Sequence, residues 1–207
     1  MSNLRLEIKR KIFHIFSILS LLLPLYMLGK YSVTIIMFFM VAFLFPVSFF
    51  RIKNVFTLWF WKIIDLVERK ENIKVLPARQ AFSLAVGFLI TSLVFDEGIL
   101  QICIISTAVY DGFATIIGLL TGKHKFPWGK SLEGTLGGIL FNTLALSMVI
   151  PVEYAFIISL FVAVVENLSR SDVWFLDDNL LIPVFTGLFS WFLDVPAELP
   201  QFFFSFL

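Results

Sequence analysis

The stretch from Asp111 to Gly138 combines ionisable and small side chains in a way that could support chemistry. The acid, Asp111, lies in an apolar run, and Thr115 and Gly118 follow it at helical spacings of four and seven residues. Small groups therefore share one helix face with the carboxylate. Leaving that carboxylate in hydrocarbon costs about 3 kcal/mol or more unless a partner, a cation or water meets it. We therefore expect Asp111 to belong to a functional site.

A basic, glycine-containing loop follows this acid, and a polar stretch comes later in the chain. The loop leads into a second apolar run that begins with Lys130, Ser131, Glu133 and Gly134, and the polar stretch covers residues 166–183. Amines and backbone N–H groups hold phosphate oxygens, while carboxylates hold magnesium. Together they predict a site for a magnesium-bound polyphosphate. The GxxxGK segment at 118–123 lacks the strand and the Ser or Thr of a P-loop.

The composition places these residues in a membrane. Of 207 residues, 59% are hydrophobic and 15% are charged, and the mean hydropathy is +0.93. A soluble domain could not bury so much apolar surface. We expect an all-α, polytopic membrane bundle that forms one domain over residues 1–207. The single cysteine, Cys103, excludes an intramolecular disulfide and a cysteine metal cluster.

Seven apolar runs are the expected transmembrane helices: 12–29, 32–50, 80–95, 98–120, 134–150, 154–168 and 179–193. Residues 54–71 differ, because Lys62, Asp65 and Arg69 recur at helical spacing among tryptophans and other apolar residues. This pattern is typical of a helix that lies in the membrane interface. Asn142, within the fifth run, is expected to hydrogen-bond between helices.

The basic residues predict the orientation of the bundle. With seven spans and a cytoplasmic N-terminus, 15 of the 16 Lys and Arg residues face the cytoplasm, and only Lys30 lies outside. This is the positive-inside bias. The same arrangement puts the loop after the fourth span and the polar stretch 166–183 on one side, so we expect the active site to face the cytoplasm.

Three blocks of residues, in this order and spacing, carry a resemblance to a known family. They are KRKIFH at 9–14; D-x-x-A-x-x-x-G at 111–118, with GK at 122–123 and KSLEG at 130–134; and Glu166 followed by DDNLLIP at 177–183. The chain resembles the CTP-dependent lipid-alcohol kinases, which include dolichol kinase, phytol kinase and the CTP-using diacylglycerol kinase. The match covers the motif core, 111–183, and the N-terminal block, whereas residues 30–95 agree only in hydrophobicity.

The resemblance implies phosphoryl transfer from CTP to a lipid hydroxyl with Mg2+ or a similar divalent cation. The expected catalytic residues are Asp111, Glu133, Asp177 and Asp178, and the expected metal ligands are Asp111, Asp177 and Asp178. The expected nucleotide contacts are Gly118, Gly122, Lys123, Lys130, Ser131, Gly134, Arg10 and Lys11, with His14, Glu166 and Asn179 as further candidates. Adjacent helical side chains diverge by about 100°, so one of Asp177 and Asp178 is expected to contact the metal while the other orients a ligand or caps the last helix.

Other interpretations are open at this point. Phosphatidate cytidylyltransferases share the first half of the pattern, but their closing block is missing here, and DDNLLIP favours the kinase. A transporter that uses Asp111 in an ion relay is a further alternative. Gly134 and Gly138 suit close helix packing as well as nucleotide access, and Lys125 is interpreted as a topological charge. The expected partners are a lipid alcohol, CTP and the bilayer, without nucleic acid; homodimer formation is left open.

Because Asp111 lies about 14 Å from the end of an unbroken fourth span, the nucleotide reaches it in one of two ways. Either a polar cavity extends inward or the helix breaks near Gly112, as helices do at some membrane ligand sites.

Overall fold

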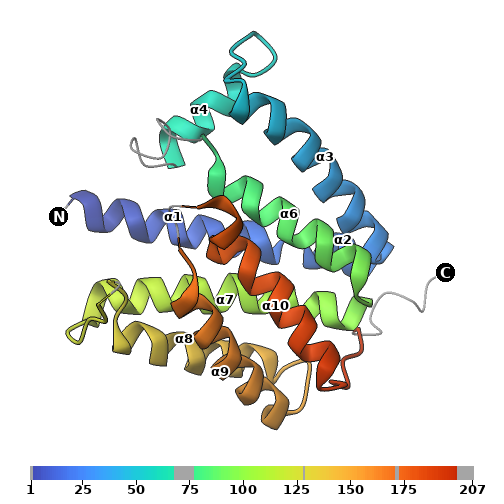
Figure 1. Ribbon diagram of the computed structural model, residues 1–207, viewed down its shortest axis with the longest axis vertical. Coiled ribbons are helices and arrows are strands. Elements are labelled where there is room, and N and C mark those ends of the chain that lie inside the picture. Colours follow the sequence, from blue (N-terminus) through green and yellow to red (C-terminus); the bar gives the residue numbers. More distant parts are fainter. Residues whose placement is uncertain (1, 68–76, 128, 171–172, 200–207) are drawn as a thin grey trace.

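The computed structural model describes residues 2–67, 77–127, 129–170 and 173–199, and it is an all-α bundle (Figure 1). Its helices are α1 (Ser2–Leu19), α2 (Leu22–Leu28), α3 (Lys30–Phe49), α4 (Leu58–Val67), α6 (Arg79–Val94), α7 (Glu97–Thr121), α8 (Leu132–Leu146), α9 (Val152–Leu168) and α10 (Asp178–Phe192), with a short 3-10 turn, η1, at Trp174–Leu176.

Three segments are long and apolar enough to cross a membrane: Leu4–Leu28, which joins α1 and α2, together with α3 and α7. They indicate a multi-pass membrane protein. A helix lies at each of the seven ranges that the sequence predicts, but α6, α8, α9 and α10 have only 15 to 17 residues. At 1.5 Å per residue they reach about 23 to 26 Å, less than the hydrocarbon thickness of about 30 Å. The seven crossings therefore stay a prediction.

The first expected span differs from the structure, because it consists of two helices. α1 begins at Ser2, and it ends at Leu19, where a turn at Ser20 and Leu21 separates it from α2. Pro24 explains the break. Its ring has no N–H to donate to the carbonyl of Ser20, four residues earlier, and it would clash with that carbonyl in a continuous helix.

The expected interfacial helix over 54–71 corresponds to α4, which is shorter. Asn54 and Thr57 form reciprocal hydrogen bonds that precede it, and residues 68–71, with Arg69, lie outside the described part of the chain. Phe60, Trp61 and Ile64 bury one face of α4 in the core, while Trp59 is exposed. A helix with one buried and one exposed apolar face is compatible with an interfacial position, which stays a prediction.

α7 is the central helix of the bundle. α1, α8, α9 and α10 pack against it, and the segment from Ile99 to Asp111 is buried along its whole circumference (Figure 1). The predicted role of Asn142 is confirmed: its amide donates to Ser159 Oγ at 2.9 Å and lies 3.4 Å from Ser106 Oγ, so one α8 side chain links α7 and α9. Buried amides in an apolar bundle need such partners.

α6 and α10 approach each other closely at Gly87. A Cβ at this position would lie 2.9 Å from Pro183 Cγ and 3.1 Å from the carbonyl oxygen of Asn179. Pro183 cannot donate to that carbonyl, four residues before it, so the oxygen is free to face the neighbouring helix. Gly87 thus sets how near the first turn of α10, with Asp178, lies to α6.

Replacing Gly87 with Leu should destabilise the protein by about 1 to 3 kcal/mol, because the added side chain meets the backbone of α10. Val94→Leu is the matched control, since Val94 is on the same helix but exposed. Thermal unfolding in detergent measures both. Equal midpoints for wild type, Gly87→Leu and Val94→Leu would contradict the close approach.

Candidate functional site

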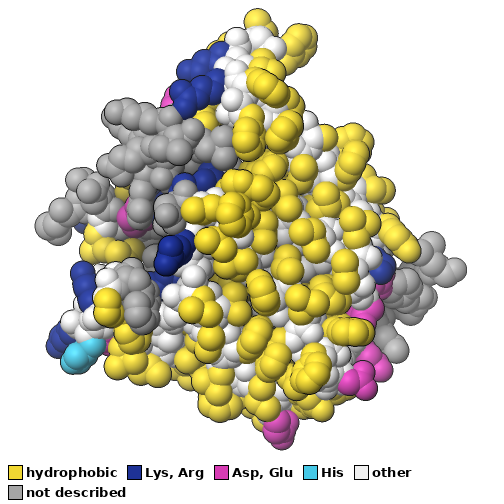
Figure 2. Space-filling model, viewed as in Figure 1, with side chains coloured by type: hydrophobic (Ala, Val, Ile, Leu, Met, Phe, Trp, Pro, Cys, Tyr) yellow, Lys and Arg dark blue, Asp and Glu magenta, His cyan; other side chains and the backbone are white. Residues whose placement is uncertain are grey.

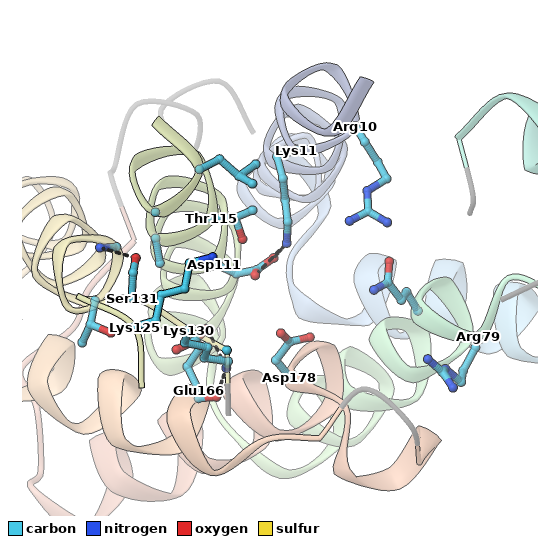
Figure 3. Close-up of a pocket in the computed structure, with 17 residues that line it drawn as sticks. Arg10, Lys11, Arg79, Asp111, Thr115, Lys125, Lys130, Ser131, Glu166 and Asp178 are labelled. Atoms are coloured by element: carbon cyan, nitrogen blue, oxygen red, sulfur yellow. Dashed lines mark hydrogen bonds and ion pairs between the residues drawn. The ribbon is translucent and has the colours of Figure 1, made fainter. Parts of the chain in front are cut away.

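A polar pocket of about 320 Å³ lies at the end of the bundle where α1 and α6 begin and α7 ends (Figure 3). α1, α6, α7, α8, α9, α10 and the loop between α7 and α8 all contribute to it. Its lining residues are Arg10, Lys11, Arg79, Gln80, Asp111, Ala114, Thr115, Gly118, Leu119, Lys125, Gly129, Lys130, Ser131, Gly134, Thr135, Glu166 and Asp178.

The pocket carries an excess of positive charge. Five of its lining residues are Lys or Arg and three are Asp or Glu, which leaves two positive charges when all are ionised. Figure 2 shows most of the visible Lys and Arg side chains on the side that holds the start of α1, a broad apolar face beside them, and Asp and Glu at the opposite, lower edge. A cleft of this charge attracts an anionic ligand.

α1 supplies the partners of Asp111. Lys11 Nζ lies 2.7 and 2.6 Å from the two carboxylate oxygens, and His14 Nε2 lies 3.1 Å from Oδ2. The carboxylate is 3% exposed, and α7 runs through it without a break. The sequence left open whether a polar cavity or a break in the helix near Gly112 gives access to Asp111. The structure shows a polar cavity, and α7 is continuous at Gly112.

Lys130 and Glu166 form the second ion pair of the pocket. Lys130 Nζ lies 2.6 Å from Glu166 Oε1, and it also donates to the carbonyl of Glu166 and to Ser169 Oγ at 3.2 Å. Ser131 caps α8, as its Oγ accepts from the backbone N–H of Gly134. The pair thus joins the start of α8 to the end of α9.

The glycines of the motif bring α7 and α8 together. A Cβ on Gly134 would lie 2.6 Å from the carbonyl oxygen of Ala114, and a Cβ on Gly118 would lie 2.8 Å from Ser131 Oγ. A Cβ on Gly122 would meet Ser131 as well, at 2.9 Å from its Cβ. Close packing of the two helices therefore requires these glycines, while Gly118 and Gly134 also line the pocket.

Asp177 and Asp178 divide two roles between them. Asp177 is fully buried and caps α10, with Oδ1 accepting from the backbone N–H of Asn179 at 3.1 Å and from its amide at 2.7 Å. Asp178 is half-buried, lines the pocket and makes no ion pair with a described residue. The expectation that one of the two acids caps the helix is confirmed.

Burial raises the pKa of Asp177 to about 7, and the neighbouring charge of Asp178 acts in the same direction. Its Oδ2 has no hydrogen-bond partner among the described residues, which suits a protonated oxygen. Of the two acids, only Asp178 lines the pocket.

Several predicted site residues lie outside the pocket lining: Gly122, Lys123, Glu133, His14, Asp177 and Asn179. Glu133 pairs on the surface with His124, whose Nδ1 lies 2.7 Å from Oε1, and this contact lowers the pKa of the Glu133 carboxyl to about 2. His14 and Asn179 support pocket residues, since they contact Asp111 and Asp178.

The structure adds pocket residues that sequence reasoning missed. Arg79 and Gln80 open α6, Lys125 lies in the loop before α8, and Thr135 lies on α8. Thr115, which the sequence places on the helix face of Asp111, lines the pocket as well. Arg79, one of the 15 basic residues that the sequence assigns to the cytoplasmic side, lines the pocket. Lys125, interpreted as topological, lines the pocket.

Asp178 fits a magnesium ion that is held mainly by phosphate oxygens. Among the described residues no three His, Cys, Asp or Glu side chains form a metal cluster. Magnesium bound with nucleotide phosphates needs only one or two protein carboxylates. Asp178 offers such a carboxylate beside basic side chains, and the buried Asn179 Oδ1 next to it has no partner in the described part of the chain.

We compared the chain with protein-family models, with curated proteins and with solved structures, and none of them matches it.

Asp177→Asn should change how stability depends on pH. Because the pKa is about 7 in the folded protein and 3.8 ordinarily, its contribution to stability is present below pH 3.8 and is lost as pH rises through 7. As pH rises from 5 to 8, the melting temperature of the wild type should therefore fall more than that of Asp177→Asn. The Asn side chain can still cap α10, but it does not titrate. Parallel melting curves for the two proteins across that range would contradict the buried acid.

Proposed function

We propose that this protein is an integral membrane kinase that transfers the terminal phosphoryl group of CTP to the hydroxyl of a membrane lipid alcohol. The observation that carries the proposal is the polar pocket, in which five basic and three acidic side chains from distant parts of the chain meet at one end of an apolar bundle. The choice of CTP rests on the resemblance of the three sequence blocks to the CTP-dependent lipid-alcohol kinases.

The basic side chains of the pocket suit a triphosphate. Lys130 and Lys11 reach the pocket from opposite walls, each held by a carboxylate, Glu166 and Asp111 respectively. Arg79, Arg10 and Lys125 add further donors to the pocket lining. Ion pairing fixes the direction of both lysines, and a phosphate oxygen would replace one present contact, such as that between Lys130 and Ser169 Oγ.

Phosphoryl transfer asks mainly for positioning and charge neutralisation. The oxygen of the lipid hydroxyl forms a bond to the γ-phosphorus, the bond between that phosphorus and the bridging oxygen breaks, and CDP leaves with the electron pair. The hydroxyl proton passes to a pocket carboxylate. Asp178 would hold the magnesium ion, which neutralises charge on the phosphate oxygens, while Lys130 and Lys11 bind the phosphates.

The position of the pocket supports a lipid acceptor and a water-soluble donor. It lies at the end of the bundle where Lys and Arg gather, next to a broad apolar surface (Figure 2). By the positive-inside rule this end faces the cytoplasm, from which CTP arrives. The five basic side chains of the pocket lie at this end, whereas Lys30, Asp96 and Glu97 lie at the opposite end of α7.

The deciding experiment follows the two ends of the nucleotide. Purified protein in liposomes receives lipid alcohols, lipid phosphates and magnesium, with CTP labelled at the α or the γ position in separate reactions. We expect γ label in the lipid, CDP as the coproduct and faster reaction with CTP than with ATP. Liposomes without protein are the control. Appearance of α label in the lipid would identify a cytidylyltransferase. No labelling of the lipid at all would contradict both enzymes and favour the transporter.

Lys125 and Lys123 provide a matched test of the pocket. Both are exposed lysines of the loop before α8, but only Lys125 lines the pocket. Lys125→Met should raise the KM for CTP about three- to tenfold, because one charge-assisted contact to phosphate is lost. Lys123→Met should leave it unchanged. Both variants should melt at the wild-type temperature, since neither lysine forms an ion pair with a described residue. An equal effect of the two substitutions on KM would argue against nucleotide binding in this pocket.

A further inference from the structure

A second pocket, of about 590 Å³, lies against α9 beside the polar pocket. It is a groove with an apolar floor and a polar end. Its lining residues, in chain order, are Thr135, Leu160, Ala163, Val164, Asn167, Leu168, Ser169 and Arg170. From Leu160 to Asn167 the groove follows α9 for about 10 Å.

The groove and the polar pocket are neighbours that share a wall. Thr135 lines both of them. Lys130 and Glu166 line the polar pocket, and Lys130 also donates to Ser169 Oγ, which lines the groove. Asn167 lies 3.5 Å from Thr135 Oγ1 and donates to the carbonyl of Ala163. A molecule in the groove thus ends next to the lysine that we assign to phosphate binding.

The apolar part of the groove faces the surroundings of the protein. Val164 is 57% exposed and Leu168 is 73% exposed. In a multi-pass membrane protein such side chains meet hydrocarbon, whereas Arg170, exposed at the other end, belongs with water and lipid headgroups. The groove therefore connects the hydrocarbon of the bilayer to the polar pocket.

We propose that this groove between α8 and α9 binds the hydrocarbon chain of the acceptor lipid, with the hydroxyl at Thr135. The proposal rests on the proposed kinase function. About 10 Å of groove guides the part of the chain nearest the hydroxyl, and the remainder lies in the bilayer. Thr135 is then a positioning residue that lines the same pocket as Lys130, and the lipid reaches the site sideways from the membrane.

Two tryptophan variants separate the groove from the general lipid-facing surface. Val164→Trp places a large ring over the groove. Leu144→Trp makes the same change at a residue of α8 that is 56% exposed and lies outside the groove. Because both side chains already face outward, neither substitution needs the core to move.

The first readout is binding and needs no CTP. A long-chain primary alcohol with a diazirine in its chain is photolysed with the protein in liposomes, and the adducts are mapped by mass spectrometry. We expect adducts concentrated in residues 160–170, removed by excess unlabelled alcohol, lost in Val164→Trp and kept in Leu144→Trp. Adducts spread over exposed apolar residues of α3, α8 and α9 alike, without competition, would overturn the groove.

The second readout is kinetic. Val164→Trp should raise the KM for a long-chain alcohol about tenfold or more and leave the KM for CTP unchanged, while Leu144→Trp should change neither. If the wild type and both variants phosphorylate alcohols with the same KM, the groove is not the lipid site, although the protein is a kinase. Specific adducts in the groove without any phosphorylation would keep the lipid site and reject the kinase.

Discussion

The buried carboxylate of Asp111 is the constraint on which the bundle depends. It is the fifteenth residue of a 25-residue apolar helix, and the next cation along the chain, Lys123, lies beyond the end of that helix. An ionised group in this position needs a partner from another helix. Lys11 and His14 of α1 supply it, so the N-terminal helix must lie along α7 with its basic face inward. Removing one partner of such a pair costs about 3 to 5 kcal/mol.

A second, partly buried pair fixes the other wall of the pocket. Lys130 comes just before α8 and Glu166 near the end of α9, and the glycines of α7 and α8 let the two helices approach until Ser131 packs against Gly118. The two pairs hold two lysines on opposite sides of one cavity. The same two ion pairs therefore hold the helices together and, in the proposed function, present the two lysines to phosphate.

Much of the fold could be predicted from the sequence because unbroken apolar runs determine where helices form in such a chain. The break between α1 and α2 was missed because the run stays apolar through Pro24, and only its lost N–H and its ring end the helix. The bounds of α6 and α10 agree with the predicted runs to within one residue, whereas α8 ends at Leu146, four residues before the end of its predicted run, because apolar residues continue beyond its last helical turn.

The candidate site was predictable where residue chemistry is unusual for a membrane. Asp111, Lys130, Glu166 and Asp178 are costly to bury, and all of them line the pocket. Glu133 lies outside the pocket lining, and its place beside the motif does not reveal its contact with His124. Arg79 and Thr135 could not be found from spacing, since tertiary packing alone brings the starts of α6 and α8 to the cavity.

The most direct test of the account is a structure of the protein with magnesium and a non-hydrolysable CTP analogue. We predict the triphosphate in the polar pocket, its terminal phosphate within hydrogen-bond distance of Lys130 or Lys11, and the metal ion on Asp178. An analogue bound away from this pocket, or a pocket that stays free of nucleotide at saturating concentration, would contradict the central claim.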